Sequence, residues 1–163
     1  MEIDREDEHC KEVYAHAGLA LYLAQVLEHG VVNASVAARM PERETITRAD
    51  IMAFETEQFA KTLGGMLRAM RRYVTVPPEV ETLLTEALRR RNYLAHHFFR
   101  KFAVQFMTAQ GRDEMLAWLH ETKDMFQRAD KALFQLMAPI REQFGITDEA
   151  IAKVVAEMPT DLK

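Results

Sequence analysis

The chain has 163 residues, of which 48% are hydrophobic and 28% are charged, and its formal net charge is −4. This composition predicts one globular domain over residues 1–163, and the acidic total argues against a protein that coats nucleic acid, which would be basic. The single cysteine, Cys10, excludes an internal disulfide and a metal site built on a thiolate cluster.

Neither a signal peptide nor a membrane-spanning helix is expected from the sequence. The N-terminal residues are acidic and lack the basic and apolar regions of a signal peptide. The longest apolar run, residues 17–24, is too short to cross a bilayer. We therefore expect a cytoplasmic protein that has no membrane partner.

Apolar residues recur at helical spacing along nearly the whole chain, and signals for strands are weak. The first helix is expected over residues 6–29. Gly30 would end it, although residues 31–40 are again compatible with a helix after a bend. A polar loop over residues 41–47 is expected to follow.

The second helix is expected over residues 50–73, with Thr47 or Asp50 as its N-cap. Gly64-Gly65 lies inside this helix. Each glycine weakens a helix by about 1 kcal/mol relative to alanine. The pair therefore suggests a kink or the close approach of another helix.

Proline and glycine set the limits of the third helix. Pro77-Pro78 is the strongest boundary signal in the chain, because proline suits the first turn of a helix. The helix is expected over residues 78–109, and Gln110-Gly111 would end it.

A fourth helix is expected over residues 113–143, with a kink at Pro139. Thr147 would cap a short last helix that ends near Met158. Four long helices with short connections predict an all-α fold, an up-down four-helix bundle with a short extra C-terminal helix.

A polar stretch interrupts the apolar stripe of the third helix. Arg91 projects into the middle of the arc that faces the core. An unpaired buried guanidinium is very unfavourable, so Arg91 must find a partner, reach solvent or lie at a second interface. Asn92, His96 and Arg100 follow one another at i, i+4 and i+8, so we expect them to be neighbours on one face.

The segment over residues 91–96, Arg-Asn-Tyr-Leu-Ala-His, resembles the signature of the HEPN superfamily. That signature is an arginine followed by a polar residue and, after four to six intervening residues, a histidine. Arg91, Asn92 and His96 match it, with four residues between the arginine and the histidine. The motif is short, but the four-helix architecture that it implies would cover most of the chain.

The resemblance implies a metal-independent endoribonuclease without a cofactor, in which a ribose 2′-OH attacks its own phosphate. His96 would move a proton, Arg91 would hold the phosphate, and Asn92 would orient one of these groups. The residues expected to bind the RNA substrate are Arg89, His97 and Arg100. A toxin or defence effector is the expected biological role.

The resemblance also implies partners. HEPN ribonucleases are usually dimers with two facing motifs, so we expect a homodimer with a composite site. A toxin would add an antitoxin or nucleotidyltransferase partner. In some HEPN toxins a tyrosine two residues beyond the motif histidine receives nucleotidyl groups. Here that position is Phe98, or Phe99 if His97 is the site histidine, and this departure puts such an antitoxin in doubt.

Other interpretations of the same residues stay open. In a structural interpretation, Arg91 pairs with a core carboxylate from another helix and His96 is a surface residue. The chain would otherwise be a catalytically silent HEPN-like module that binds a nucleotide, RNA or protein, or a helical scaffold whose methionines mediate assembly. His97 also fits the motif spacing, but His96 is favoured because it shares a face with Asn92.

Overall fold

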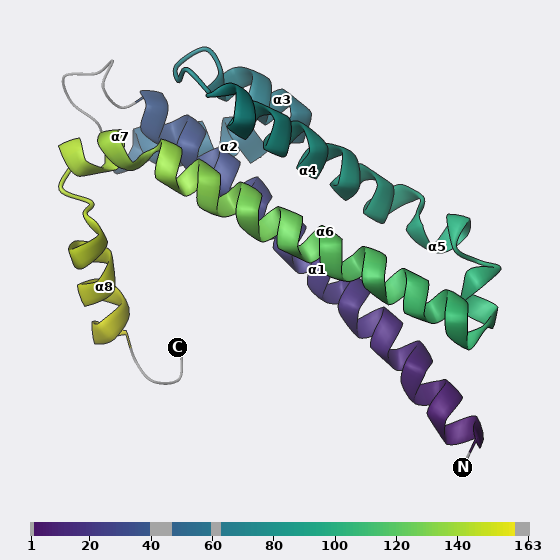
Figure 1. Ribbon diagram of the computed structural model, residues 1–163. Coiled ribbons are helices and arrows are strands. Elements are labelled where there is room, and N and C mark those ends of the chain that lie inside the picture. The colour runs from purple at the N-terminus through teal and green to yellow at the C-terminus, as the bar shows by residue number, and fades with distance from the viewer. Residues whose placement is uncertain (1, 40–46, 60–62, 159–163) are drawn as a thin grey trace.

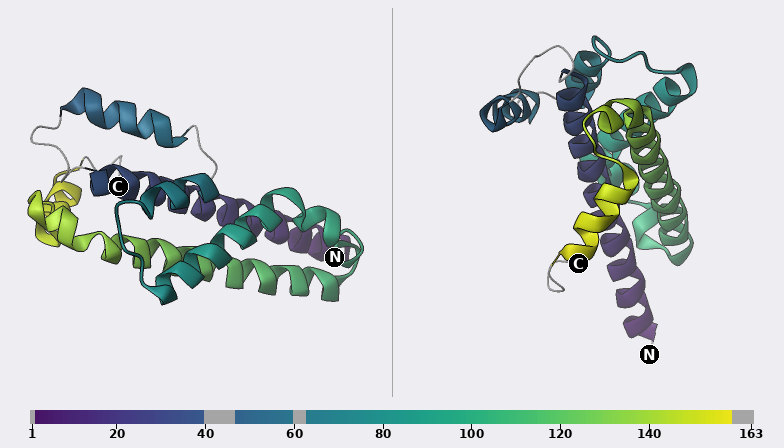
Figure 2. Two further views of the ribbon diagram at one scale, coloured as in Figure 1. Left: turned by 90° about the horizontal axis from the view of Figure 1, so that it is seen from above. Right: turned by 90° about the vertical axis from the view of Figure 1, so that its left-hand side faces the viewer.

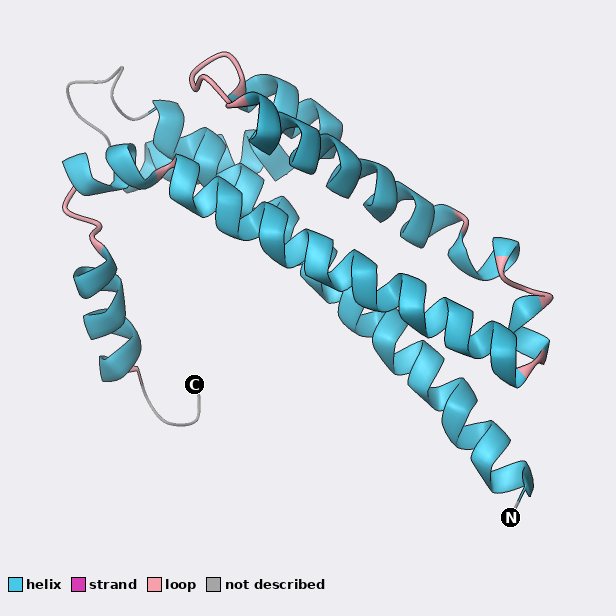
Figure 3. Ribbon diagram, viewed as in Figure 1, coloured by secondary structure: helices cyan, strands magenta, loops and turns pink. Residues whose placement is uncertain are grey.

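The structure is a computed structural model in which residues 2–39, 47–59 and 63–158 are described, and all regular structure in these ranges is helical (Figures 1 and 3). The elements follow in the order α1 (Glu2–Arg39), α2 (Arg48–Phe59), α3 (Leu63–Met70), α4 (Pro78–His96), α5 (Phe98–Lys101), the 3₁₀ helix η2 (Gln105–Met107), α6 (Ala109–Leu136), α7 (Ala138–Gln143) and α8 (Asp148–Glu157). The predicted all-α class with a short C-terminal helix is confirmed. Among these described residues, no helix is long and apolar enough to cross a membrane.

The two longest helices, α1 and α6, lie side by side and run in the same direction (Figures 1 and 2). The contacts between the two helices follow the same order along both of them, as expected for parallel helices. His9 Nε2 lies 3.2 Å from Asp113 Oδ1 near one end, and His16 Nδ1 lies 2.7 Å from Lys123 Nζ further along. α3 packs against α1, and α4 packs against α6. The α1–α6 pair is therefore the spine on which the other helices are placed.

The parallel direction of α1 and α6 differs from a simple up-down order of four helices, in which the first and the fourth are antiparallel. The difference arises because the predicted helix over residues 50–73 is two helices, α2 and α3. Residues 60–62, between them, lie outside the described residues, as does the predicted loop over residues 41–47 apart from Thr47. The chain thus reverses its direction once more than expected before α4.

The core lies where α1, α4 and α6 meet. On α1 the buried positions include Ala17, Ala20 and Ala24, whose short side chains let α6 pack close to the helix. The larger fully buried side chains of these three helices include Val13, Leu27, Leu84, Met115, Leu119, Phe126 and Leu133. Burying each such side chain contributes roughly 1.5–3 kcal/mol. Gly30 does not end α1, because the helix continues through it to Arg39.

Local side-chain chemistry sets several of the helix starts. Thr47 caps α2, because its Oγ1 accepts from the Asp50 backbone N–H at 3.2 Å while the Thr47 N–H donates to Asp50 Oδ2 at 3.0 Å. Pro78 begins α4 as predicted. Thr147 caps α8 by accepting from the Ala150 N–H. These boundaries follow from chemistry that is local in the sequence.

Three predicted helix limits are corrected by the structure. The third helix does not continue to residue 109, because α4 ends at His96. Gly111 closes no helix but lies in the first turn of α6, which Thr108 caps. Near Pro139, where a kink was predicted, the helix is interrupted at Met137. The next helix, α7, has the proline in its first turn.

The glycine pair, predicted to mark a kink or the close approach of another helix, lies near the start of α3. A Cβ added at Gly64 would lie 3.4 Å from Leu88 Cδ2. This is an ordinary van der Waals contact with α4, and the predicted helix is interrupted just before the pair, between α2 and α3.

Candidate functional site

Three consecutive arginines near the end of α4 point in three directions, because successive helical residues are rotated by about 100°. Arg89 is exposed, with its Nη1 3.6 Å from Glu86 Oε2. Arg90 turns toward α6, and Arg91 turns toward α1. The arginine run is therefore not one continuous basic surface, and only Arg89 of the three extends mainly into solvent.

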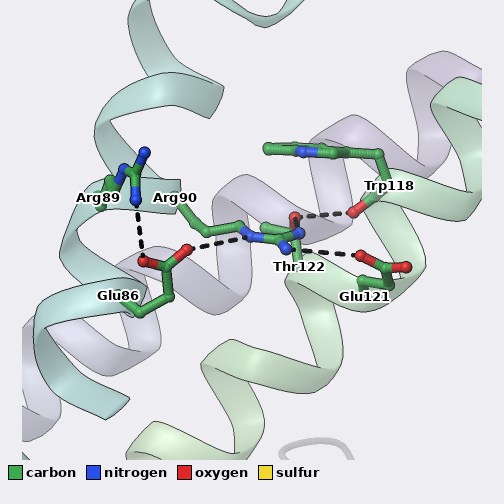
Figure 4. A network of polar contacts seen from close by, with 6 residues as sticks. All are labelled: Glu86, Arg89, Arg90, Trp118, Glu121 and Thr122. Atoms are coloured by element: carbon green, nitrogen blue, oxygen red, sulfur yellow. Dashed lines mark hydrogen bonds and ion pairs between the residues drawn. The ribbon is translucent and has the colours of Figure 1, made fainter. Parts of the chain in front are cut away.

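Arg90 is part of a network between α4 and α6 (Figure 4). Its Nη1 donates to Thr122 Oγ1 at 3.1 Å, and its guanidinium carbon lies 5.3 Å from the centroid of the Trp118 ring. The carboxylates of Glu86 and Glu121 lie 3.7 and 3.5 Å from the guanidinium nitrogens. With its charge balanced and its side chain partly buried, Arg90 holds the two helices together.

Arg91 makes the contact that its place on the apolar stripe requires. Its Nε donates to Glu28 Oε1 at 2.7 Å, and its Nη2 lies 2.7 Å from the same oxygen. The side chains of Arg91 and Glu28 are 30% and 20% exposed, so water only partly screens the pair. This is the intramolecular carboxylate partner that the structural interpretation expected, and it comes from α1.

The contacts of Arg91 leave part of its guanidinium available. A guanidinium carries five N–H donors. Glu28 Oε1 accepts from the Nε–H and forms an ion pair with Nη2, and Asn92 Oδ1 accepts one Nη1–H at 3.1 Å. One N–H on Nη1 and one on Nη2 have no acceptor among the described residues. This pair of donors matches two oxygens of a phosphate.

The end of α4 leaves both candidate histidines on the surface. His96 is the last residue of the helix, and His97 leaves the helical conformation with φ −130° and ψ −24°. Both side chains are exposed, and their ring centroids are 6.3 Å apart. His96 follows Asn92 by one helical turn, as predicted, but no contact within the described residues joins His96 to Arg91.

The break at His97 changes the placement of Arg100. The predicted relation of Asn92, His96 and Arg100 required a continuous helix, and Arg100 instead lies on α5, beyond the break. The break coincides with burial of Phe98, which is 1% exposed and packs 5.1 Å from the Trp118 ring. Packing of Phe98 in the core thus accompanies the change in chain direction that separates Arg100 from the motif face.

An aromatic surface next to the motif was missed by the sequence interpretation. The exposed ring of Tyr14 on α1 lies 5.6 Å from Phe99 and 5.4 Å from Phe106, centroid to centroid. Arg100 and Lys101 on α5 are exposed beside Phe99 in the chain. Aromatic rings with basic neighbours are the combination that single-stranded nucleic acids use for stacking and charge.

Glu28 was also missed, although a signal for it exists. It is an acidic residue four positions after buried Ala24 and three before buried Val31, at the edge of the core stripe of α1. Two charges of opposite sign that interrupt two apolar stripes are natural partners.

No group of three or more histidine, cysteine, aspartate or glutamate side chains is arranged as metal ligands within the ranges that the structure describes. Compared with known proteins, the chain matches no family model, no curated protein and no solved structure.

Proposed function

We propose that the chain is a metal-independent endoribonuclease of HEPN type that acts at the end of α4. The observation that carries this proposal is the state of Arg91. Glu28 and Asn92 hold its guanidinium in place, and two N–H donors remain for a phosphate. His96, one helical turn beyond Asn92, is exposed.

In the proposed reaction, the 2′-oxygen of a ribose attacks the adjacent phosphorus. The O2′–P bond forms and the P–O5′ bond breaks, so the products are a 2′,3′-cyclic phosphate and a 5′-hydroxyl. His96 takes the proton of the 2′-OH, a task that suits an imidazole near neutral pH. Arg91 stabilises the charge that develops on the phosphate oxygens. Asn92 positions Arg91 through their hydrogen bond.

The reaction needs a second proton transfer, because the 5′-oxygen must be protonated as it leaves. One chain offers one motif histidine, which is why the proposal includes a homodimer. His96 of the partner subunit would supply this proton in a composite site between two α4 helices. Exposure of His96 at the helix end makes such a site accessible to RNA.

Arg89, His97 and Arg100 are proposed to contact RNA outside the reacting phosphate. All three are exposed. A toxin or defence effector in the cytoplasm remains the proposed role, with an antitoxin or nucleotidyltransferase as the proposed partner. Phe98, two residues beyond His96, has no hydroxyl and is buried, so we propose no nucleotidyl transfer to that position.

A second candidate function is a catalytically silent module that binds RNA, a nucleotide or a protein. The observation that favours it is the same ion pair, because Glu28 neutralises the charge of Arg91 and is itself negative toward a phosphate. In this alternative the pair is structural, and the exposed basic residues serve only for binding.

A series of variants separates the two candidates. Cleavage of a mixed RNA pool in the presence of chelator should fall about 10²–10³-fold in Arg91→Ala, as for other sites that lose a charge-stabilising donor. Arg91→Lys should restore little, because lysine lacks the fork of donors. Glu28→Gln should reduce cleavage less than Arg91→Ala, because an amide can still accept one bond from Arg91.

The matched control is Arg68→Ala, which removes an exposed arginine on α3 away from the motif. Circular dichroism verifies the folding of each variant. Absence of cleavage in the wild type, with RNA binding retained in Arg91→Ala, would replace the ribonuclease with the silent module.

A further inference from the structure

A cavity of about 720 Å³ lies between the C-terminal halves of α1 and α6. Its walls are largely apolar and include Val26, Ala34, Leu133, Phe134, Met137 and Ile151. It takes residues from α1, α6, α7, α8 and the segment between α7 and α8, and none of its lining residues belongs to α4. Its size and lining are those of a small-molecule site.

Asp130 places a carboxyl group in the wall of this largely apolar cavity. Its carboxyl group lines the apolar space and has neither a hydrogen-bond nor an ion-pair partner among the described residues. Burial raises the pKa of Asp130, and no neighbouring cation opposes this effect. A carboxylate in such surroundings is unfavourable for folding, so its presence indicates a requirement other than stability.

Gly30 provides the space for this carboxyl group. A Cβ added at Gly30 would lie 2.7 Å from Asp130 Oδ1, so any larger residue would displace the carboxylate. Glycine within a helix is itself unfavourable by about 1 kcal/mol relative to alanine. Two residues that weaken the fold therefore meet at one point of the cavity wall.

The other charged group of the cavity, Arg141, lies against Phe134 and Asp148. The Arg141 guanidinium lies 3.6 Å from the centroid of the Phe134 ring, its Nη1 lies 3.5 Å from Asp148 Oδ1, and its Nη2 donates to the Phe134 carbonyl at 3.5 Å. Its Nε and Nη1 atoms are buried and have no hydrogen-bond partner among the described residues. The carboxylate of the cavity wall is Asp130, which accepts hydrogen bonds and attracts positive charge.

We infer that this cavity binds an amphipathic amine, whose protonated nitrogen pairs with Asp130 and whose apolar body lies along α1 and α6. The site is separate from the motif on α4 and independent of the proposed ribonuclease function. Tyr22, Gln25, His29 and Asn33 supply the polar side of the cavity along α1. The partly buried carboxylate makes the contact to an ammonium stronger than it would be in water.

The probe for this site is monodansylcadaverine, which joins an apolar naphthalene to a primary amine. Its emission should shift to the blue as it binds the wild-type protein at neutral pH. Its N-acetyl form, which has no charge, should bind roughly tenfold more weakly, a difference of about 1.4 kcal/mol. In Asp130→Asn the two forms should bind equally and weakly.

Two further variants complete the experiment. Asp124→Asn removes an exposed carboxylate on the same helix and should bind the amine as the wild type does. Ala37→Leu fills part of the cavity and should reduce binding of both forms. Asp130→Asn should also raise the midpoint of thermal unfolding, because the carboxylate weakens the fold.

Equal affinity of the wild type for the amine and its acetylated form would overturn the proposal, as would absence of binding by either form. A lower unfolding midpoint in Asp130→Asn would also overturn it, because the carboxyl group would then have a structural role.

Discussion

Lys123 is a cation buried between α1 and α6, with only 8% of its surface exposed. Its Nζ lies 2.7 Å from Nδ1 of His16, whose ring centroid is 4.5 Å from that of His120. Burial, followed by the charges of Lys123 and His120, lowers the pKa of His16, while Glu12 acts in the opposite direction. A neutral His16 can accept a hydrogen bond from Lys123, whereas a protonated His16 would repel it.

This arrangement predicts that the fold weakens in mild acid. The pKa of His16 in the unfolded chain is near 6.5, and in the folded chain it is lower. Below that pH the unfolded chain binds more protons, so stability is fully present above about pH 6.5 and is lost as the pH falls toward the folded pKa. Urea unfolding followed by circular dichroism should show this loss in the wild type and a smaller one in His16→Gln. His97→Gln, at an exposed histidine, should retain the wild-type dependence. If the free energy of unfolding depended equally on pH in all three proteins, His16 would not be the residue responsible for the loss.

Single residues also show how far the sequence predicts the site. The off-pattern position of Arg91 is enough to predict that it needs a partner, and Glu28 is that partner. The partner could not be assigned beforehand, because pairing across 63 positions depends on which faces of α1 and α4 meet. Tyr14 was missed for the same reason, since it reaches the motif region only through packing of α1 against Phe99 and Phe106.

At the scale of elements, the first turn of α6 is packed tightly against η2. A Cβ added at Gly111 would overlap the backbone of Gln105, whereas one added at Gly18 on α1 would meet nothing within 4 Å. Gly111→Ala should therefore destabilise the fold by about 1–3 kcal/mol or more, as for other changes that overpack a tight site. Gly18→Ala should stabilise it by roughly 0.5–1 kcal/mol, because alanine favours a helix. Chemical denaturation measures both changes, and a neutral Gly111→Ala would show that η2 does not pack as described.

Helix starts were predicted better than helix ends, and the difference is physical. The starts at Pro78 and Thr147 depend on proline geometry and on a capping hydroxyl, both of which are local in the sequence. The end of α4 at His96 coincides with burial of Phe98 against Trp118, which is twenty residues away along the chain. No side chain between residues 96 and 98 signals this end by itself. The division of the second predicted helix into α2 and α3 lies just before Gly64-Gly65, the pair that suggested a kink in this helix.

At the scale of the whole molecule, the proposed chemistry requires two copies of the chain. The predicted state in solution is a homodimer with twice the 18.8 kDa mass of one chain. Light scattering at micromolar concentration measures this mass. Cleavage per chain should fall on dilution over the same concentration range in which the dimer dissociates, because each site needs groups from both copies. A monomer with undiminished cleavage at every concentration would contradict the composite site.

The proposed role of His96 has its most direct test in the dependence of cleavage on the ribose 2′-OH. The measurement uses an RNA oligonucleotide and its 2′-deoxy analogue, each incubated with wild type or His96→Ala in chelator, with mass spectrometry of the products. We predict that the wild type converts only the RNA, to fragments that end in a 2′,3′-cyclic phosphate, and that His96→Ala is slower by about 10²–10⁴-fold, the typical contribution of proton transfer. Equal cleavage of both substrates, or unchanged cleavage by His96→Ala, would contradict it.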